Sequence, residues 1–187
     1  MQSFRNLSKI ESKITELLQN WQTAGKIHDF FLVDLEKIVI TPKVRIKCMY
    51  GCQSYGKMKK CPPTDTLSPE ECQKYLISYR KAVIMRFSPE RDQTPPPNNQ
   101  ALLLELEREI FLADFPFALT IFPHHCVMCN DCKLDQPCKN PMKSRPSISS
   151  LCIDILGTLQ GLGITQQILE DKTPKKEWYY IGMVLID

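Results

Sequence analysis

Residues 117–138 read FALTIFPHHCVMCNDCKLDQPC, a stretch that joins a buried-strand pattern directly to a cysteine motif. The apolar run from Phe117 to Phe122 has the length and composition of a buried strand. Four cysteines then fall within 13 residues, namely Cys126, Cys129, Cys132 and Cys138. Loops that follow strand ends often carry functional sites. The stretch therefore predicts a metal-binding loop at the end of a strand.

The spacing of these four cysteines favours a 4Fe–4S cluster. Three of them are separated by two residues each, which resembles the C-x2-C-x2-C run of bacterial-type ferredoxins. The fourth, Cys138, follows after five residues instead of three, and Pro141 lies nearby. The alternative is a tetrahedral zinc site, which generally uses two separate C-x2-C knuckles. Because the middle cysteine adds nothing to a single zinc ion, we prefer iron–sulfur.

A second cysteine motif, Cys48, Cys52 and Cys61, lies earlier in the chain and predicts a second metal site. Gly51 and Gly56 permit the close backbone approach that a loop around a cluster needs. Lys57, Lys59 and Lys60 would stabilise an anionic thiolate cluster, although a solvated basic loop is the plainer interpretation. The Pro62-Pro63 pair fixes the backbone just after the last cysteine.

The fourth position of this site is left open by the sequence. Its candidates are Cys72, a residue of the other motif, His124, His125, water or a substrate. An open iron position would allow redox chemistry at the cluster, whereas full ligation would favour electron transfer. We expect Cys72 to be a buried structural thiol and the histidine pair to be hydrogen-bonded structural residues, and Cys152 stays undecided.

Composition limits the functional class and the compartment. Nine cysteines, an odd number, point to metal or redox chemistry in a reducing cytosol and not to disulfides. The N-terminus lacks a signal-peptide pattern and no apolar run is long enough for a membrane helix, so we expect a cytoplasmic protein that does not bind membranes. The net charge of +3 does not predict nucleic-acid binding. A redox partner protein is the expected partner, and the oligomeric state stays open.

Helical and strand patterns alternate along the chain, which predicts an α/β (or α+β) fold. We expect a single domain with a central mixed sheet flanked by helices and with two cysteine-rich metal loops after strand ends. An N-terminal helix within residues 1–25 would pack on a cysteine-rich domain of residues 26–187. The predicted helices cover residues 8–23, 68–79, 100–113 and 147–162. The predicted strands cover residues 37–40, 44–47, 81–87, 117–122 and 178–186.

The order of these motifs resembles a family of predicted metal-binding proteins from anaerobic prokaryotes, a cysteine-rich domain of unknown function. The resemblance covers roughly residues 25–187. It rests on Cys48-x3-Cys52-x2-Tyr55-Gly56, Cys61-Pro62-Pro63, Ser68-Pro69-Glu70-Glu71, Tyr79, Cys126-x2-Cys129-x2-Cys132-x5-Cys138, Pro141, Arg145-Pro146-Ser147 and Ile153-Asp154. It implies metal or cluster binding without an established reaction. In the family pattern glycine occupies the position of Cys152, and the His124-His125 pair is not expected.

Two functional classes follow from the sequence. The first is an iron–sulfur protein that transfers electrons or performs redox chemistry at an open iron position. The second is a zinc-stabilised module that binds another macromolecule. Because no phosphate-binding glycine loop, catalytic triad or zinc-protease helix is present, no other class of enzyme is indicated.

Overall fold

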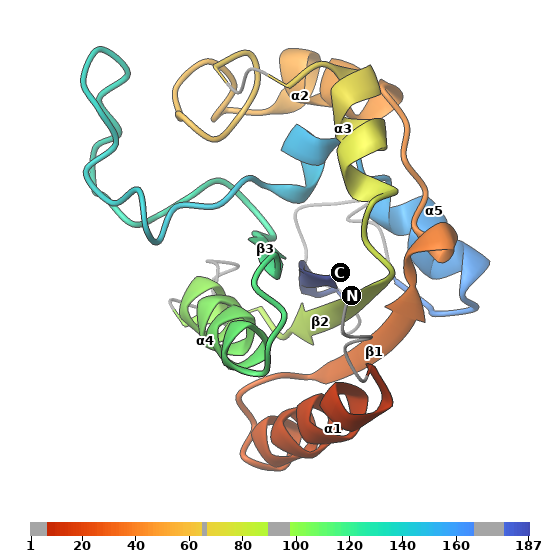
Figure 1. The fold of residues 1–187 in the computed structure, drawn as a ribbon. Coiled ribbons are helices and arrows are strands. Elements are labelled where there is room, and N and C mark those ends of the chain that lie inside the picture. The colour runs from red at the N-terminus through yellow and green to blue at the C-terminus, as the bar shows by residue number, and fades with distance from the viewer. Residues whose placement is uncertain (1–6, 65–66, 90–97, 167–177) are drawn as a thin grey trace, which may run out of the picture.

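The computed structural model describes residues 7–64, 67–89, 98–166 and 178–187 of the 187-residue chain. A four-stranded sheet in the order β1-β2-β4-β3 forms its centre, and helices cover both faces (Figure 1). The strands are β1 (Asp29–Asp34), β2 (Lys81–Phe87), β3 (Leu119–Ile121) and β4 (Tyr180–Ile186). The predicted single-domain α/β class is confirmed. Each pairing between the described strands is antiparallel, however. The expectation of a mixed sheet, which would also contain parallel strands, is therefore wrong for these strands.

Two apolar layers lie on opposite faces of this sheet because side chains alternate along β2. Val83 and Met85 pack against α1 (Leu7–Thr23) and α4 (Asn99–Leu112). Ala82 and Ile84 face the other layer. The helices that complete this layer are α3 (Pro69–Leu76), α5 (Ile155–Gly161) and the short 3-10 helices η1 (Leu35–Lys37) and η2 (Ile148–Leu151). Among the described residues, no helix is both long enough and apolar enough to cross a membrane.

Local signals in the sequence locate several elements correctly. The predicted helices at residues 8–23 and 100–113 and the strand at 81–87 correspond to α1, α4 and β2. Ser68 and Glu71 form the expected capping box at the start of α3. The helix predicted over residues 147–162 is instead divided into η2 and α5. Cys152 lies between them with a φ of 60°, a conformation that a continuous helix cannot contain.

Two predicted strands before the first cysteine motif are wrong. Residues 37–40 contain the end of η1 and a single bridge from Ile40 to Ile153. Residues 44–47 belong to a helix, α2 (Lys43–Gly51), so Cys48 lies inside a helix and does not follow a strand. The strand of this region is β1. Its sequence DFFLVD contains the short apolar run FFLV, which is typical of a strand.

A substitution at Gly182 in β4 tests the packing between the sheet and α4. A Cβ atom at Gly182 would collide with the side chain of Leu103, which is fully buried. Replacing Gly182 with Ala should therefore lower the free energy of unfolding by about 1–3 kcal/mol, as overpacking does. Chemical denaturation measures this change. Gly161→Ala in α5, where no atom lies within 4 Å of the added Cβ, is the matched control. Equal stability of the two variants would contradict this account.

Candidate metal centres

The four cysteines of the later motif line one small cavity, which we call the four-thiol site. Cys126, Cys129, Cys132 and Cys138 share its wall with Asn140 and Ser144. The other part of the wall is Met58-Lys59-Lys60, which belongs to the earlier cysteine loop. The predicted metal loop after β3 therefore brings all four of its cysteines to one cavity.

The loop that carries this site has almost no apolar anchorage. Residues 123–143, all of which the structure describes, contain no buried residue and no helix or strand. The loop extends away from the sheet and the helices in Figure 1. Cys126 and Met128 at its start contact the core layer of α1 and α4. Most of the loop must therefore be held by interactions that the apolar core does not supply.

Hydrogen-bond donors approach the sulfur atoms of the four-thiol site. The Asn140 side-chain amide donates to Cys129 Sγ at 3.0 Å and to the Met128 carbonyl at 3.2 Å. The Lys59 backbone N–H donates to Cys132 Sγ at 3.5 Å. The Ser144 hydroxyl lies 3.5 Å from Cys138 Sγ. Donors directed at sulfur favour the thiolate form, which is the form that binds metal.

The pKa values of two cysteines in this site shift in opposite directions. The hydrogen bond with Ser144 is the main cause that lowers the pKa of Cys138, with Lys60 and Lys59 adding positive charge nearby. Burial raises the pKa of Cys126, and the neighbouring cysteines raise it further. A thiol of this second kind keeps its proton until a cation arrives, so metal binding there would release a proton.

The earlier motif forms a three-thiol site made of Cys48, Cys52 and Cys61. Cys48 lies within α2, Cys52 caps the end of that helix and is exposed, and Cys61 is buried. Cys48 and Cys61 each interact electrostatically with Cys52 and with one another. Burial raises the pKa of Cys61 to about 11. The structure therefore gathers the three predicted cysteines in one region, on an edge of the molecule that solvent reaches through Cys52.

Serine hydroxyls of η2 surround two thiols of the three-thiol site. Ser147 and Ser150 act to lower the pKa of Cys61, and Ser149 acts to lower the pKa of Cys48, in both cases against the larger effect of burial. The Ser150 hydroxyl also donates to the Lys60 carbonyl at 2.6 Å, which fixes the backbone beside Cys61. Sequence reasoning missed this role of the Ser147–Ser150 segment because serine has no metal-ligand signature of its own.

The two cysteine loops are in direct contact. Lys59 donates its N–H to Cys132 of the four-thiol site, and Cys61 of the three-thiol site follows only two residues later. Lys59 also donates from Nζ to the Leu134 carbonyl at 2.8 Å. Ser54 of the earlier loop hydrogen-bonds to His125 at 3.0 Å. The sequence did not indicate this contact, because the paired residues are more than 70 positions apart.

The sulfur atoms do not converge on a single point. Among the described residues, no three His, Cys, Asp or Glu side chains are close enough together to hold one metal ion. The four-thiol site is instead a cavity with a sulfur-lined wall. Its donor set of four thiols suits either an iron–sulfur cluster or zinc by chemistry.

The histidine pair anchors the start of the metal loop to α4. Gln100 donates to the His125 carbonyl at 2.8 Å and accepts from the Val127 N–H at 3.2 Å. Asn99 bonds to His124 at 3.2 Å. Burial lowers the pKa of both histidines, so they are neutral at neutral pH. Both side chains are hydrogen-bonded to protein groups, which is the structural arrangement expected from the sequence.

The two remaining cysteines lie in the core. Cys72 of α3 is fully buried, as expected, and its thiol donates to the Ser150 carbonyl at 3.6 Å. Arg45 of α2 donates to Cys72 Sγ at 3.4 Å. Cys152 is also fully buried and interacts electrostatically with Cys48. Its positive φ is a conformation that glycine adopts without strain.

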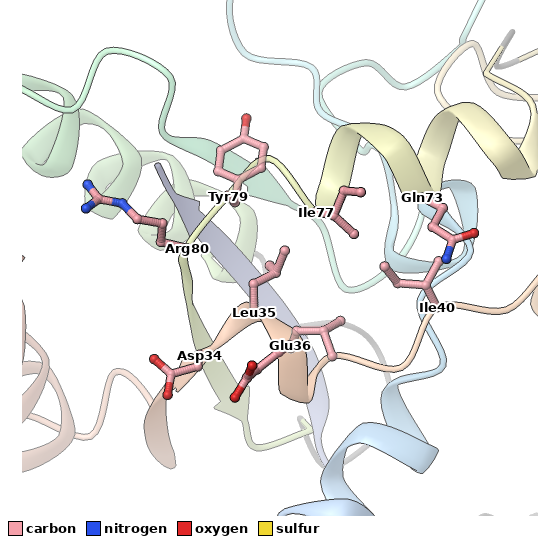
Figure 2. A pocket seen from close by; sticks show the side chains of 9 residues that line it. Asp34, Leu35, Glu36, Ile40, Gln73, Ile77, Tyr79 and Arg80 are labelled. Atoms are coloured by element: carbon pink, nitrogen blue, oxygen red, sulfur yellow. The ribbon is translucent and has the colours of Figure 1, made fainter. Parts of the chain in front are cut away.

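A groove of about 590 Å³ lies away from both cysteine sites, between η1 and α3. In Figure 2 the side chains of Leu35, Ile40 and Ile77 gather at its middle, and the Asp34 and Glu36 carboxylates stand at one side. Two of its polar side chains, Tyr79 and Asp34, already have partners. The Tyr79 hydroxyl donates to the Phe117 carbonyl, and Asp34 accepts from Lys81. The groove contains no cysteine, so we do not assign the metal chemistry to it.

Comparison with known proteins agrees with the chemistry of the cysteine sites. A family model described as "Predicted metal-binding protein (DUF2284)" matches residues 32–186. The matched region contains all nine cysteines. No curated protein and no solved structure matches the chain. The resemblance to a family of predicted metal-binding proteins is thereby confirmed, and metal binding is the function that it supports.

Proposed function

This chain belongs to the family of predicted metal-binding proteins, and we propose that it is an iron–sulfur redox protein with two cluster sites. The four-thiol site holds a 4Fe–4S cluster that carries electrons. The three-thiol site holds a second cluster, in which one iron has no cysteine ligand and is open to a small molecule. Iron–sulfur clusters bound at these sites would supply one-electron chemistry.

The observation that carries the proposal is the wall of the four-thiol site. Four cysteines from one loop line a cavity, and the amide of Asn140 and the N–H of Lys59 donate to two of their sulfur atoms. Hydrogen bonds to cluster sulfurs are one of the means by which proteins set the reduction potential of iron–sulfur centres.

The contact between the sites supports a shared role in electron transfer. Cys61 follows Lys59 by two positions, a step that spans at most about 7 Å of chain. The same short segment therefore contacts Cys132 of one site and supplies Cys61 to the other. Electrons that enter one cluster have a short path to the second. The exposed Cys52 leaves the second site accessible from solvent.

The zinc-stabilised interaction module is the competing proposal, and one observation favours it. Residues 123–143 lack buried side chains, so any metal that binds the four thiols would order the loop, as structural zinc does. Metal-dependent folding alone therefore does not separate the two proposals. The identity of the metal does.

Metal analysis of anaerobically purified protein separates them. We expect about eight iron and eight sulfide per chain, with a broad visible absorption that dithionite bleaches, as two cubane clusters would give. About four of each would mean that only one of the two sites holds a cluster. A colourless protein that contains one or two zinc ions would overturn the iron–sulfur proposal and favour the interaction module.

A further inference from the structure

The charge of the chain is unevenly divided between the cysteine loops and the remaining residues. Residues 43–64 contain six Lys and Arg and no Asp or Glu, and residues 123–147 contain four basic and two acidic residues. These two segments, which we call the cysteine lobe, carry a net charge of +8. Since the whole chain carries +3, the other residues carry −5. The small net charge therefore conceals a strongly basic lobe around the metal sites.

One helix of this lobe presents a side without a protein partner. In α2, which the structure describes in full, no residue is buried. Ile46, Met49 and Tyr50 are 59%, 53% and 83% exposed, which is unusual for large apolar side chains. They lie three and four positions apart and so share one side of the helix. Lys43 and Lys47 flank them and are exposed as well. We call these five residues the α2 face.

The opposite side of the same helix faces the three-thiol site. Arg45 donates to the Ser150 carbonyl at 2.6 Å and to the Leu67 carbonyl at 2.5 Å. Cys48 lies one turn further along, beside Ser149, and Cys52 ends the helix. A protein bound on the α2 face would therefore lie one helix diameter, about 10 Å, from these thiols.

We propose that the α2 face is the docking surface for an acidic redox protein that exchanges electrons with the three-thiol site. This inference rests on the proposed iron–sulfur function. Surfaces of opposite charge steer such partners together and raise the association rate. An exposed apolar centre with a charged rim is the usual composition of a protein interface. Complexes of this kind are small and short-lived, so a helix face of this size is sufficient.

Charge reversal on the α2 face tests the inference in the iron-loaded full-length chain. The double variant Lys43→Glu/Lys47→Glu should be reduced roughly tenfold more slowly by reduced flavodoxin, an acidic flavoprotein, at low ionic strength. The difference should vanish at about 1 M salt, where the screening length is about 3 Å. The matched control is Lys9→Glu/Lys26→Glu, which makes the same change of charge at Lys9 in α1 and at Lys26, three residues after the end of that helix; α1 lies at the far end of the molecule from α2 (Figure 1).

A second variant and a second probe identify the partner. Tyr50→Ser should weaken the complex while leaving the salt dependence unchanged, because it removes apolar contact and no charge. If the double variant and the control are reduced at equal rates, the inference is overturned. It is equally overturned if the α2 variants impair binding of single-stranded RNA and leave reduction by flavodoxin unchanged. Iron analysis of each sample separates these outcomes from failure of the iron–sulfur proposal, which an iron-free wild-type protein would reveal.

Discussion

Replacing Cys129 with Ser is expected to remove about half of the bound iron, because one of two cluster sites loses a thiolate ligand. Asn140 donates to Cys129 Sγ and to the Met128 carbonyl, so the change also removes an anchor of the loop. Residues 123–143 contribute no buried side chain that could hold the loop in its place. Limited proteolysis should therefore cut this segment much faster in the variant than in the wild-type protein, while β2 and β4 stay protected.

Cys72→Ala is the control for this experiment. Cys72 is fully buried in α3 and packs in the apolar layer of the sheet, and it does not line the four-thiol cavity. Its replacement should lower the stability by about 1 kcal/mol, as small losses of core contact do, and leave the iron content unchanged. If Cys129→Ser keeps all of its iron and its resistance to proteolysis, metal does not organise the loop.

The elements that the sequence predicted correctly are those whose signals are local. Ile10, Ile14 and Leu18 repeat at helical spacing and are all buried in α1. Ser68 and Glu71 satisfy each other's backbone N–H groups within four residues of chain. Such patterns need no knowledge of the remaining structure. They also indicated the later cysteine loop, whose four cysteines are neighbours in the sequence and line one cavity.

The region of α2 was mispredicted because its conformation depends on distant contacts. Val44-Arg45-Ile46-Lys47 alternates apolar and basic residues, which is the pattern of a half-buried strand. The helix is held instead by Arg45, which bonds to the carbonyls of Leu67 and Ser150. The second of these is 105 residues away. Tertiary contact overrides local preference at such positions.

The arrangement of the two cysteine loops could not be read from the sequence for the same reason. Each motif is visible alone, but the Lys59 to Cys132 bond joins positions 73 residues apart, and the Ser54 to His125 bond joins positions 71 apart. The basic lobe was hidden by a net charge summed over the whole chain. The contact between the two loops and the basic lobe can be recognised only when the cysteines and the charged residues are located in the fold.

Cys52→Ala should eliminate the cluster of the three-thiol site and leave that of the four-thiol site intact, because Cys52 belongs to the three-thiol site alone. In the reduced wild-type protein, two paramagnetic clusters joined through the short Lys59–Cys61 segment should broaden each other's electron paramagnetic resonance signals. The variant should show one simple signal and about half of the iron. Gln53→Ala, which changes the exposed neighbour of Cys52, should retain all of the iron and the broadened spectrum. If Cys52→Ala matches the wild type in both measurements, the earlier motif is a structural loop, and the chain has a single cluster site.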